Sequence, residues 1–151
     1  MIKTIYWAAP CFTQAERFWN RCCAKCLTSY GYKVILPQDE AEKFVGNDGK
    51  IDFGALAKNC QEQAIKSDFM VAILDGPDPD SVMSMEVGLR TGSFGTNIIG
   101  IRTDIRVAED GQLNRLVYEI IYFASFNESY FELCAVIAQK IKDIIGKTLA
   151  P

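Results

Sequence analysis

Short apolar runs alternate with amphipathic stretches along this chain. The apolar runs predict strands, and they cover residues 4–8, 33–36, 69–74, 97–101 and 120–123. The run 69–74 is apolar throughout, as is typical of a central strand that is covered on both faces. Because predicted strands and helices alternate, we expect a parallel sheet with right-handed crossovers. We therefore predict one three-layer α/β domain over residues 1–151, flavodoxin-like or Rossmann-like, with a five-stranded parallel sheet.

Capping signals predict where the first and last helices begin. Thr13 and Glu16 have the spacing of a capping box, so a helix should start near Thr13 and end near Gly31. Ser129 and Glu132 repeat the spacing before the last helix. The positions expected to face the core have helical spacing. They are Phe18, Cys22 and Cys26, then Leu56, Ala57, Cys60 and Ala64, and finally Leu133, Val136, Ile137, Ile141 and Ile144.

Composition and charge bound the class of protein. The 151 residues are 49% hydrophobic and 23% charged, which suits one compact domain with a normal core. The net charge of −3 gives no reason to expect a nucleic-acid partner or an anionic membrane. No apolar run approaches the roughly 20 residues that span a bilayer. The start of the chain reads as a first strand rather than a signal peptide, so we expect a cytoplasmic protein.

The chain has six cysteines and no histidine. Cys22, Cys23 and Cys26 could suggest a metal site, but zinc needs about four ligands, and neither histidine nor a second cysteine pair is present. Reduced thiols are the preferred interpretation, and we expect no metal. There is no G-x-G-x-x-G or Walker A motif, so the commonest nucleotide-phosphate cradles are missing, and we expect no cofactor.

Acidic residues, glycine and proline follow the predicted strand 69–74 at once, and Glu86 comes in the first turns of the next helix. Because parallel strands end at one edge of a sheet, the loops after the strands 4–8, 69–74 and 97–101 should converge there. Asp80 and Glu86 can then both face the crevice, and the helix dipole would favour an ionised, nucleophilic Glu86. The alternative is that the aspartates are only turn and cap residues and Glu86 a solvated helix residue.

Four motifs resemble those of the nucleoside 2-deoxyribosyltransferases. They are Ile5-Tyr6-Trp7-Ala8-Ala9-Pro10-Cys11-Phe12, Leu36-Pro37-Gln38-Asp39, Leu74-Asp75-Gly76-Pro77 with Asp80 and Glu86-Val87-Gly88, and Arg102-Thr103-Asp104-Ile105-Arg106 with Asn114. Each motif alone is weak. Their shared order along most of the chain makes the resemblance fairly specific.

The resemblance implies a role for each matching residue. Glu86 would attack C1′ of a deoxynucleoside and leave a covalent deoxyribosyl-enzyme, which a second base would attack, so that configuration is retained. Tyr6 would orient the Glu86 carboxylate, and Asp80 would accept a hydrogen bond from the sugar 5′-hydroxyl. Asn114 would reach into the site of a neighbouring subunit of a homo-oligomer. The remaining candidate substrate-binding residues are Ala8, Phe12, Asp75 and Gly76. The partners would be a deoxynucleoside and a free nucleobase.

Departures from the family pattern leave two alternatives open. Val82 stands where the family has glycine, and Arg90 has no assignable role. Cys60 stands where the family has an acid or amide that contacts the base, with Asn59 or Gln61 as the alternative in a shifted register. One alternative is a deoxynucleoside 5′-monophosphate N-glycosidase, since Ser81 and Ser84 lie near the 5′ position. The other is a catalytically silent nucleoside- or nucleotide-binding domain.

Overall fold

The computed structural model describes residues 1–76, 81–94, 97–103, 122–124 and 129–149. These residues contain a five-stranded sheet of order β2-β1-β3-β4-β5, and every neighbouring pair is parallel. The strands are β1 (Thr4–Ala8), β2 (Lys33–Ile35), β3 (Phe69–Ile73), β4 (Ile98–Ile101) and β5 (Tyr122–Ala124). This confirms the predicted parallel sheet and selects the flavodoxin-like strand order. The order reverses between β1 and β3, and ligands of such folds bind at that reversal.

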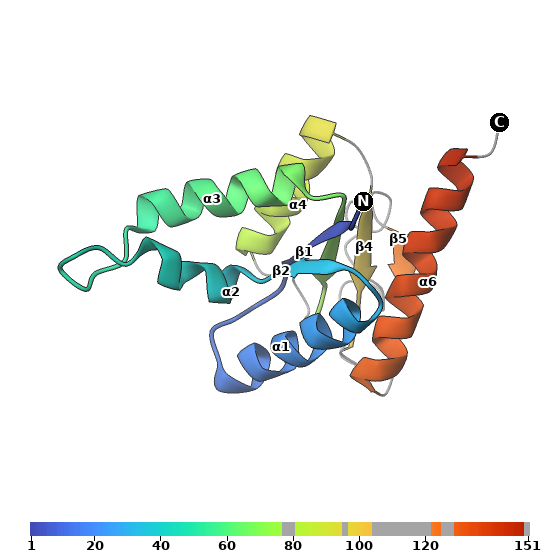
Figure 1. Ribbon diagram of the computed structural model, residues 1–151, viewed down its shortest axis with the longest axis horizontal. Coiled ribbons are helices and arrows are strands. Elements are labelled where there is room, and N and C mark those ends of the chain that lie inside the picture. Colours follow the sequence, from blue (N-terminus) through green and yellow to red (C-terminus); the bar gives the residue numbers. More distant parts are fainter. Residues whose placement is uncertain (77–80, 95–96, 104–121, 125–128, 150–151) are drawn as a thin grey trace.

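Helices cover both faces of the sheet, which makes three layers (Figure 1). They are α1 (Gln14–Ser29), α2 (Pro37–Glu40), the 3₁₀ helix η1 (Ala41–Phe44), α3 (Phe53–Lys66), α4 (Ser81–Phe94) and α6 (Tyr130–Leu149). Helices α1 and α6 pack together on one face, and α3 and α4 pack together on the other. Side chains alternate along β1, so Ile5 and Trp7 enter the α1–α6 core while Tyr6 and Ala8 enter the α3–α4 core.

The predicted limits of α1 are confirmed, but its predicted inner face is only partly right, with Cys26 packed against the core as expected. Thr13 accepts a hydrogen bond from the Glu16 amide and Glu16 returns one to the Thr13 amide, which completes the capping box. Gly31, with φ of +91°, follows the helix. Phe18, however, is 71% exposed, whereas Asn20 is buried.

Asn20 is buried because its side chain is fully engaged. Its Oδ1 accepts a hydrogen bond from the Trp7 indole, and its Nδ2 donates to Pro10 O and to Gln38 Oε1, each at 3.0 Å. An asparagine with these partners can be buried without losing its hydrogen bonds. A pattern that counts only apolar residues cannot find this helix face.

The polar segment 38–50 contains short helices that the hydrophobic pattern did not predict. Pro37 occupies the first turn of α2, where its missing amide proton costs nothing. Lys43 forms an ion pair with Glu40 at 2.6 Å, and Asn59 of α3 donates to the same carboxylate at 3.3 Å. These contacts dock the segment against α3, close to the carboxyl edge of the sheet.

Candidate active site

Tyr6 and Glu86 meet between β1 and α4. The Tyr6 hydroxyl donates a hydrogen bond of 2.5 Å to Glu86 Oε1, and both side chains are buried, Glu86 with 7% of its surface exposed. Strand alternation directs Tyr6 toward α3 and α4, and the buried neighbours Met83 and Val87 place Glu86 on the inner face of α4. Two residues 80 positions apart in the sequence are thus brought into direct contact.

The surroundings of this pair keep the Tyr6 hydroxyl a hydrogen-bond donor. Burial, followed by the negative charge of Glu86, raises the pKa of Tyr6 far above its usual range. The expected help from the helix dipole is weak, because the first turn of α4 contains no acidic residue and the dipole acts mainly within that turn. A short, charge-assisted hydrogen bond from Tyr6 stabilises the Glu86 carboxylate.

Cys60 of α3 completes this cluster. Its thiol lies close enough to Tyr6 and Glu86 for the three groups to affect one another's pKa values. Burial raises the pKa of the Cys60 thiol, the charge of Glu86 adds to the rise, and the neighbouring Tyr6 hydroxyl opposes it. A protonated thiol therefore occupies the position where the family resemblance leads one to expect a base-contacting acid or amide.

Asp75 joins the ends of two neighbouring strands. Its carboxylate accepts hydrogen bonds from the Thr103 amide at 2.6 Å and from the Thr103 hydroxyl at 2.5 Å. Gly76 follows with φ of +93°, a conformation that favours glycine. Arg102 donates to Leu74 O at 3.2 Å. These contacts fix the loop after β3 to the loop after β4, as expected where parallel strands end together.

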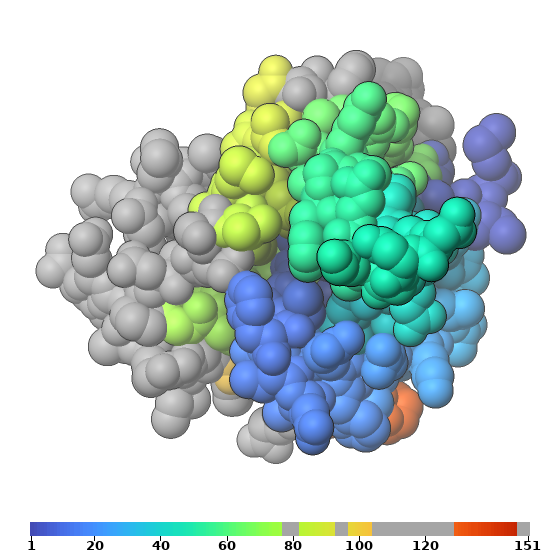
Figure 2. All heavy atoms as spheres, turned by 90° about the vertical axis from the view of Figure 1, so that its left-hand side faces the viewer, coloured from blue at the N-terminus to red at the C-terminus, as the bar shows by residue number. Residues whose placement is uncertain are grey.

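A cavity of about 350 Å³ opens at the same edge, on the opposite face of the sheet from Glu86. Its wall combines the ends of β1, β3 and β4 with the start of α1, through Ala9, Pro10, Ala15, Glu16, Trp19, Asn20, Ile73, Asp75 and Thr103. Figure 2 shows the molecule from a side on which α1, in blue, lies below α3 and α4, in green and yellow-green.

The other predicted site residues differ in their surroundings. Ala8 is buried in the same core as Tyr6, whereas Phe12 is 75% exposed in the loop before α1. Asp80 and Asn114 lie outside the described residues, so their predicted roles stay predictions. Within the described part of the chain, no group of three or more histidine, cysteine or acidic side chains could hold a metal ion. None of the helices there is long and apolar enough to cross a membrane.

The structure gives Arg90 the role that sequence analysis could not assign. The side chain is 4% exposed, and it donates hydrogen bonds to Ala64 O at 2.7 Å and to Asp68 O at 2.9 Å. The last carbonyls of a helix have no partners within that helix, so Arg90 supplies donors at the end of α3. Because Arg90 lies one turn after Glu86, it ties α4 to α3 beside the Tyr6 cluster.

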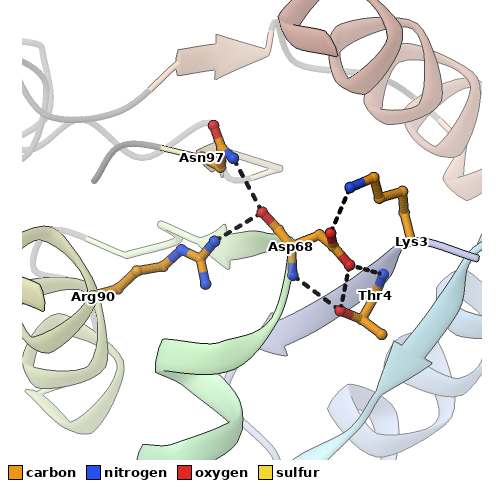
Figure 3. A network of polar contacts seen from close by, with 5 residues as sticks. All are labelled: Lys3, Thr4, Asp68, Arg90 and Asn97. Carbon is orange, nitrogen blue, oxygen red and sulfur yellow. Dashed lines mark hydrogen bonds and ion pairs between the residues drawn. The ribbon is translucent and has the colours of Figure 1, made fainter. Parts of the chain in front are cut away.

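Arg90 belongs to a wider network around Asp68 (Figure 3). Asn97 donates to the same Asp68 carbonyl at 3.2 Å. The Asp68 carboxylate accepts hydrogen bonds from Lys3 Nζ at 2.7 Å and from the amide and hydroxyl of Thr4, both at 2.8 Å. The network joins β1, β3, α4 and the start of β4 at the amino edge of the sheet.

Comparison with known proteins identifies the family of this chain. The sequence profile described as nucleoside 2-deoxyribosyltransferase-like matches residues 2–105, which is more than half of the chain. The chain belongs to this family. A search of curated proteins found no match.

Solved structures with the same fold align with most of this chain. A conserved protein from Enterococcus faecalis V583 has a TM-score of 0.70 and 22% identity over 93% of this chain and 99% of its own. A 2-deoxyribosyltransferase from Bacillus psychrosaccharolyticus has a TM-score of 0.63 and 17% identity over 86% of this chain and 89% of its own. A CMP N-glycosidase from Clostridium botulinum has a TM-score of 0.54 and 16% identity over 93% of this chain and 99% of its own. At these identities the likeness shows the fold of the family.

Proposed function

We propose that this protein transfers the 2-deoxyribosyl group between nucleobases of 2′-deoxynucleosides. Family membership supports an enzyme that acts on N-glycosidic bonds. The observation that carries the specific proposal is the buried hydrogen bond from Tyr6 to Glu86, because it holds a carboxylate in the orientation that a nucleophile needs. Both residues match the family motifs.

In the first step, a Glu86 carboxylate oxygen attacks C1′ of the bound deoxynucleoside. The N-glycosidic bond breaks, its electron pair leaves with the base, and an ester bond to Glu86 forms. The transition state resembles an oxocarbenium ion, so negative charge beside C1′ stabilises it.

In the second step, a nitrogen of the incoming base attacks C1′ from the face that the first base left. The ester bond to Glu86 breaks, its electron pair returns to the carboxylate, and the proton of the attacking nitrogen passes through solvent to the anion of the first base. Two inversions give retention of configuration, as in retaining glycosidases. The site would be completed by Asp80 on the 5′-hydroxyl and by Asn114 from a neighbouring subunit of a homo-oligomer.

The test incubates the purified protein with deoxyinosine and either free adenine or free cytosine, followed by chromatography. We expect a new deoxynucleoside from the native protein and none from Glu86→Ala. Unchanged product formation by Glu86→Ala would contradict the proposal. The absence of a reaction with every combination of deoxynucleoside and free base would also contradict it.

Hydrolysis of deoxynucleoside monophosphates is the second candidate. It is supported by the fold shared with the Clostridium botulinum CMP N-glycosidase. A carboxylate at Asp80 would repel a 5′-phosphate, which favours free nucleosides. Free base without a new nucleoside, and faster turnover of dCMP or dGMP than of the nucleosides, would establish hydrolysis instead.

A further inference from the structure

We infer that the cavity on the α1 side of the sheet binds a small substituted ammonium ion, at a site separate from Glu86. The inference goes beyond the proposed base exchange and does not depend on it, so either can fail without the other.

The cavity lies where sheets of this kind bind ligands. Its wall combines the residues that follow β1 with the ends of β3 and β4, so it opens where the strand order reverses. Its volume of about 350 Å³ is within the range of small-molecule sites. Ile73 in its wall belongs to the α1–α6 core, whereas Tyr6, which donates to Glu86, belongs to the α3–α4 core. The sheet therefore separates this cavity from the candidate active site.

Two carboxylates set the charge of the cavity wall. They belong to Glu16 and Asp75, and among the described residues that line the cavity no side chain is cationic. The positive end of the α1 dipole lies nearby, but the Glu16 carboxylate offsets it by accepting hydrogen bonds from the Phe12 and Thr13 amides at 2.9 and 2.8 Å. The wall therefore repels a phosphate or carboxylate ligand and attracts a cation.

Both carboxylates are held in place without a ligand. Glu16 is fixed by the two amides that donate to it, and the Asp75 carboxylate accepts hydrogen bonds from the amide and the hydroxyl of Thr103. A cation that enters the cavity would not have to order either side chain. The entropic cost of binding is therefore low.

An aromatic ring in the same wall narrows the class of cation. Trp19 lines the cavity, and its ring centroid lies 5.9 Å from that of the fully buried Trp7. The Trp7 indole donates to Asn20 Oδ1 at 3.0 Å, which fixes the ring behind Trp19. Tryptophan is the aromatic side chain that attracts cations best, and quaternary ammonium ions are recognised in this way. A metal ion would instead require several oxygen ligands at coordination distance.

The first experiment measures the binding of choline by intrinsic fluorescence. The chain has two tryptophans, and since Trp19 lines the cavity and Trp7 packs on it, the signal reports on this side of the sheet. The comparison compound is the neutral isostere of choline, with a tert-butyl group in place of the trimethylammonium group. We expect choline to bind at least about tenfold more tightly, as for a cation beside an indole and carboxylates. Equal affinities, or no saturable signal with choline, would overturn the inference.

Glu16→Gln and Glu132→Gln form a matched pair of variants. Each glutamate is the third residue of its helix, and its amide donates to the capping hydroxyl, of Thr13 for α1 and of Ser129 for α6. Glutamine suits the same capping position, so both variants should fold. We expect Glu16→Gln to weaken choline binding at least about fivefold and Glu132→Gln to leave it within about twofold. Equal effects would mean that choline responds to the net charge of the protein, which would overturn the inference.

Ala15→Lys tests the cavity with both carboxylates retained. Ala15 lines the cavity and is exposed, so a lysine there adds a positive charge to the wall without entering the core. We expect this variant to lose the choline signal, because the added ammonium group repels the ligand and competes for the carboxylates. Choline binding as in the native protein would contradict the assignment to this cavity.

Glu86→Ala tests whether the cavity is separate from the candidate active site. We expect this variant to bind choline within about twofold of the native affinity, because Glu86 lies across the sheet and its charge is screened. Loss of choline binding would place the cation at Glu86 and overturn the inference. Choline binding by a protein that shows no base exchange would contradict only the proposed function.

Discussion

Asp68 and Glu86 are two carboxylates that lie against the same sheet in different surroundings. Asp68, just before β3, accepts three hydrogen bonds from Lys3 and Thr4. Glu86 is more deeply buried, and Tyr6 donates a short hydrogen bond to it. Lys3 and Thr4 stabilise the charge of Asp68 at the partly exposed amino edge of the sheet, whereas the Tyr6 hydroxyl orients a buried carboxylate, as a nucleophile requires. The contrast separates a structural acid from a candidate nucleophile.

The largest expected effect comes from removing the charge of Glu86. We expect Glu86→Gln to lower kcat for base exchange at least about 1,000-fold, because loss of a nucleophile removes the covalent route. Asp68→Asn is the matched control, with kcat within about threefold. Chromatographic rates of the two variants measure the difference, and equal losses would remove the distinction between the two carboxylates.

The next largest effect should come from Arg90, which links the surroundings of the two carboxylates. We expect Arg90→Met to lower the free energy of unfolding by about 2–4 kcal/mol, because the buried carbonyls of Ala64 and Asp68 lose their charged donor. Urea unfolding measures the change.

Arg21→Met is the control for the Arg90 substitution. Arg21 forms an exposed ion pair with Asp39 at 2.9 Å, and its loss should cost less than about 1 kcal/mol. If the two arginine variants lose similar free energies, Arg90 does not fasten α4 to α3 as described.

Tyr6→Phe tests the Glu86 side of this comparison, and we expect a smaller fall in kcat than for Glu86→Gln. The variant retains the ring in the core and loses only the hydroxyl, so the fold should persist while Glu86 loses its donor. We expect kcat to fall about 10- to 100-fold, as for a hydrogen bond to a charged group. Steady-state rates of base exchange measure this effect.

Tyr32→Phe is the matched control for Tyr6→Phe. The Tyr32 hydroxyl donates to Ala138 O at 3.5 Å on the α1–α6 side of the sheet, so its loss should leave kcat within about twofold. An equal fall in both variants would point to a general effect of losing a tyrosine hydroxyl.

Regular patterns in the sequence allowed the fold to be predicted. The specific polar contacts inside the fold could not be predicted in this way. The apolar run at β3 and the capping box of α1 depend on local periodicity and spacing, which a sequence displays directly. Burial of Asn20 depends on partners from β1 and α2, which only the folded chain brings together. The predicted inner face of α1 therefore included the exposed Phe18 and omitted the buried Asn20.

The candidate site was predictable to a similar degree. Tyr6 and Glu86 could be proposed as a pair because both match motifs of the family that the sequence resembles. The influence of Cys60 on the pKa of Tyr6 could not be foreseen, since an apolar stripe explains Cys60 equally well. Arg90 was missed because an arginine four residues after a glutamate usually indicates a solvated helix face. In the structure its side chain is buried and donates to Ala64 O near the end of α3.

The smallest expected effect concerns the acid stability conferred by Asp68. Burial alone would raise the pKa of Asp68, but hydrogen bonds from Lys3 and Thr4 lower it to about 2. Because the folded pKa lies below the unfolded value of about 3.9, the contribution is complete above the unfolded value and is lost as the pH falls from about 4 to 2. The carboxylate is partly exposed, so solvent screening should limit it to about 1 kcal/mol. Urea unfolding at pH 7 and pH 3 should therefore show a smaller loss of stability on acidification for Asp68→Asn than for the native protein. An equal loss in both proteins would mean that the network of Figure 3 holds the strands by geometry alone, without a charge that responds to pH.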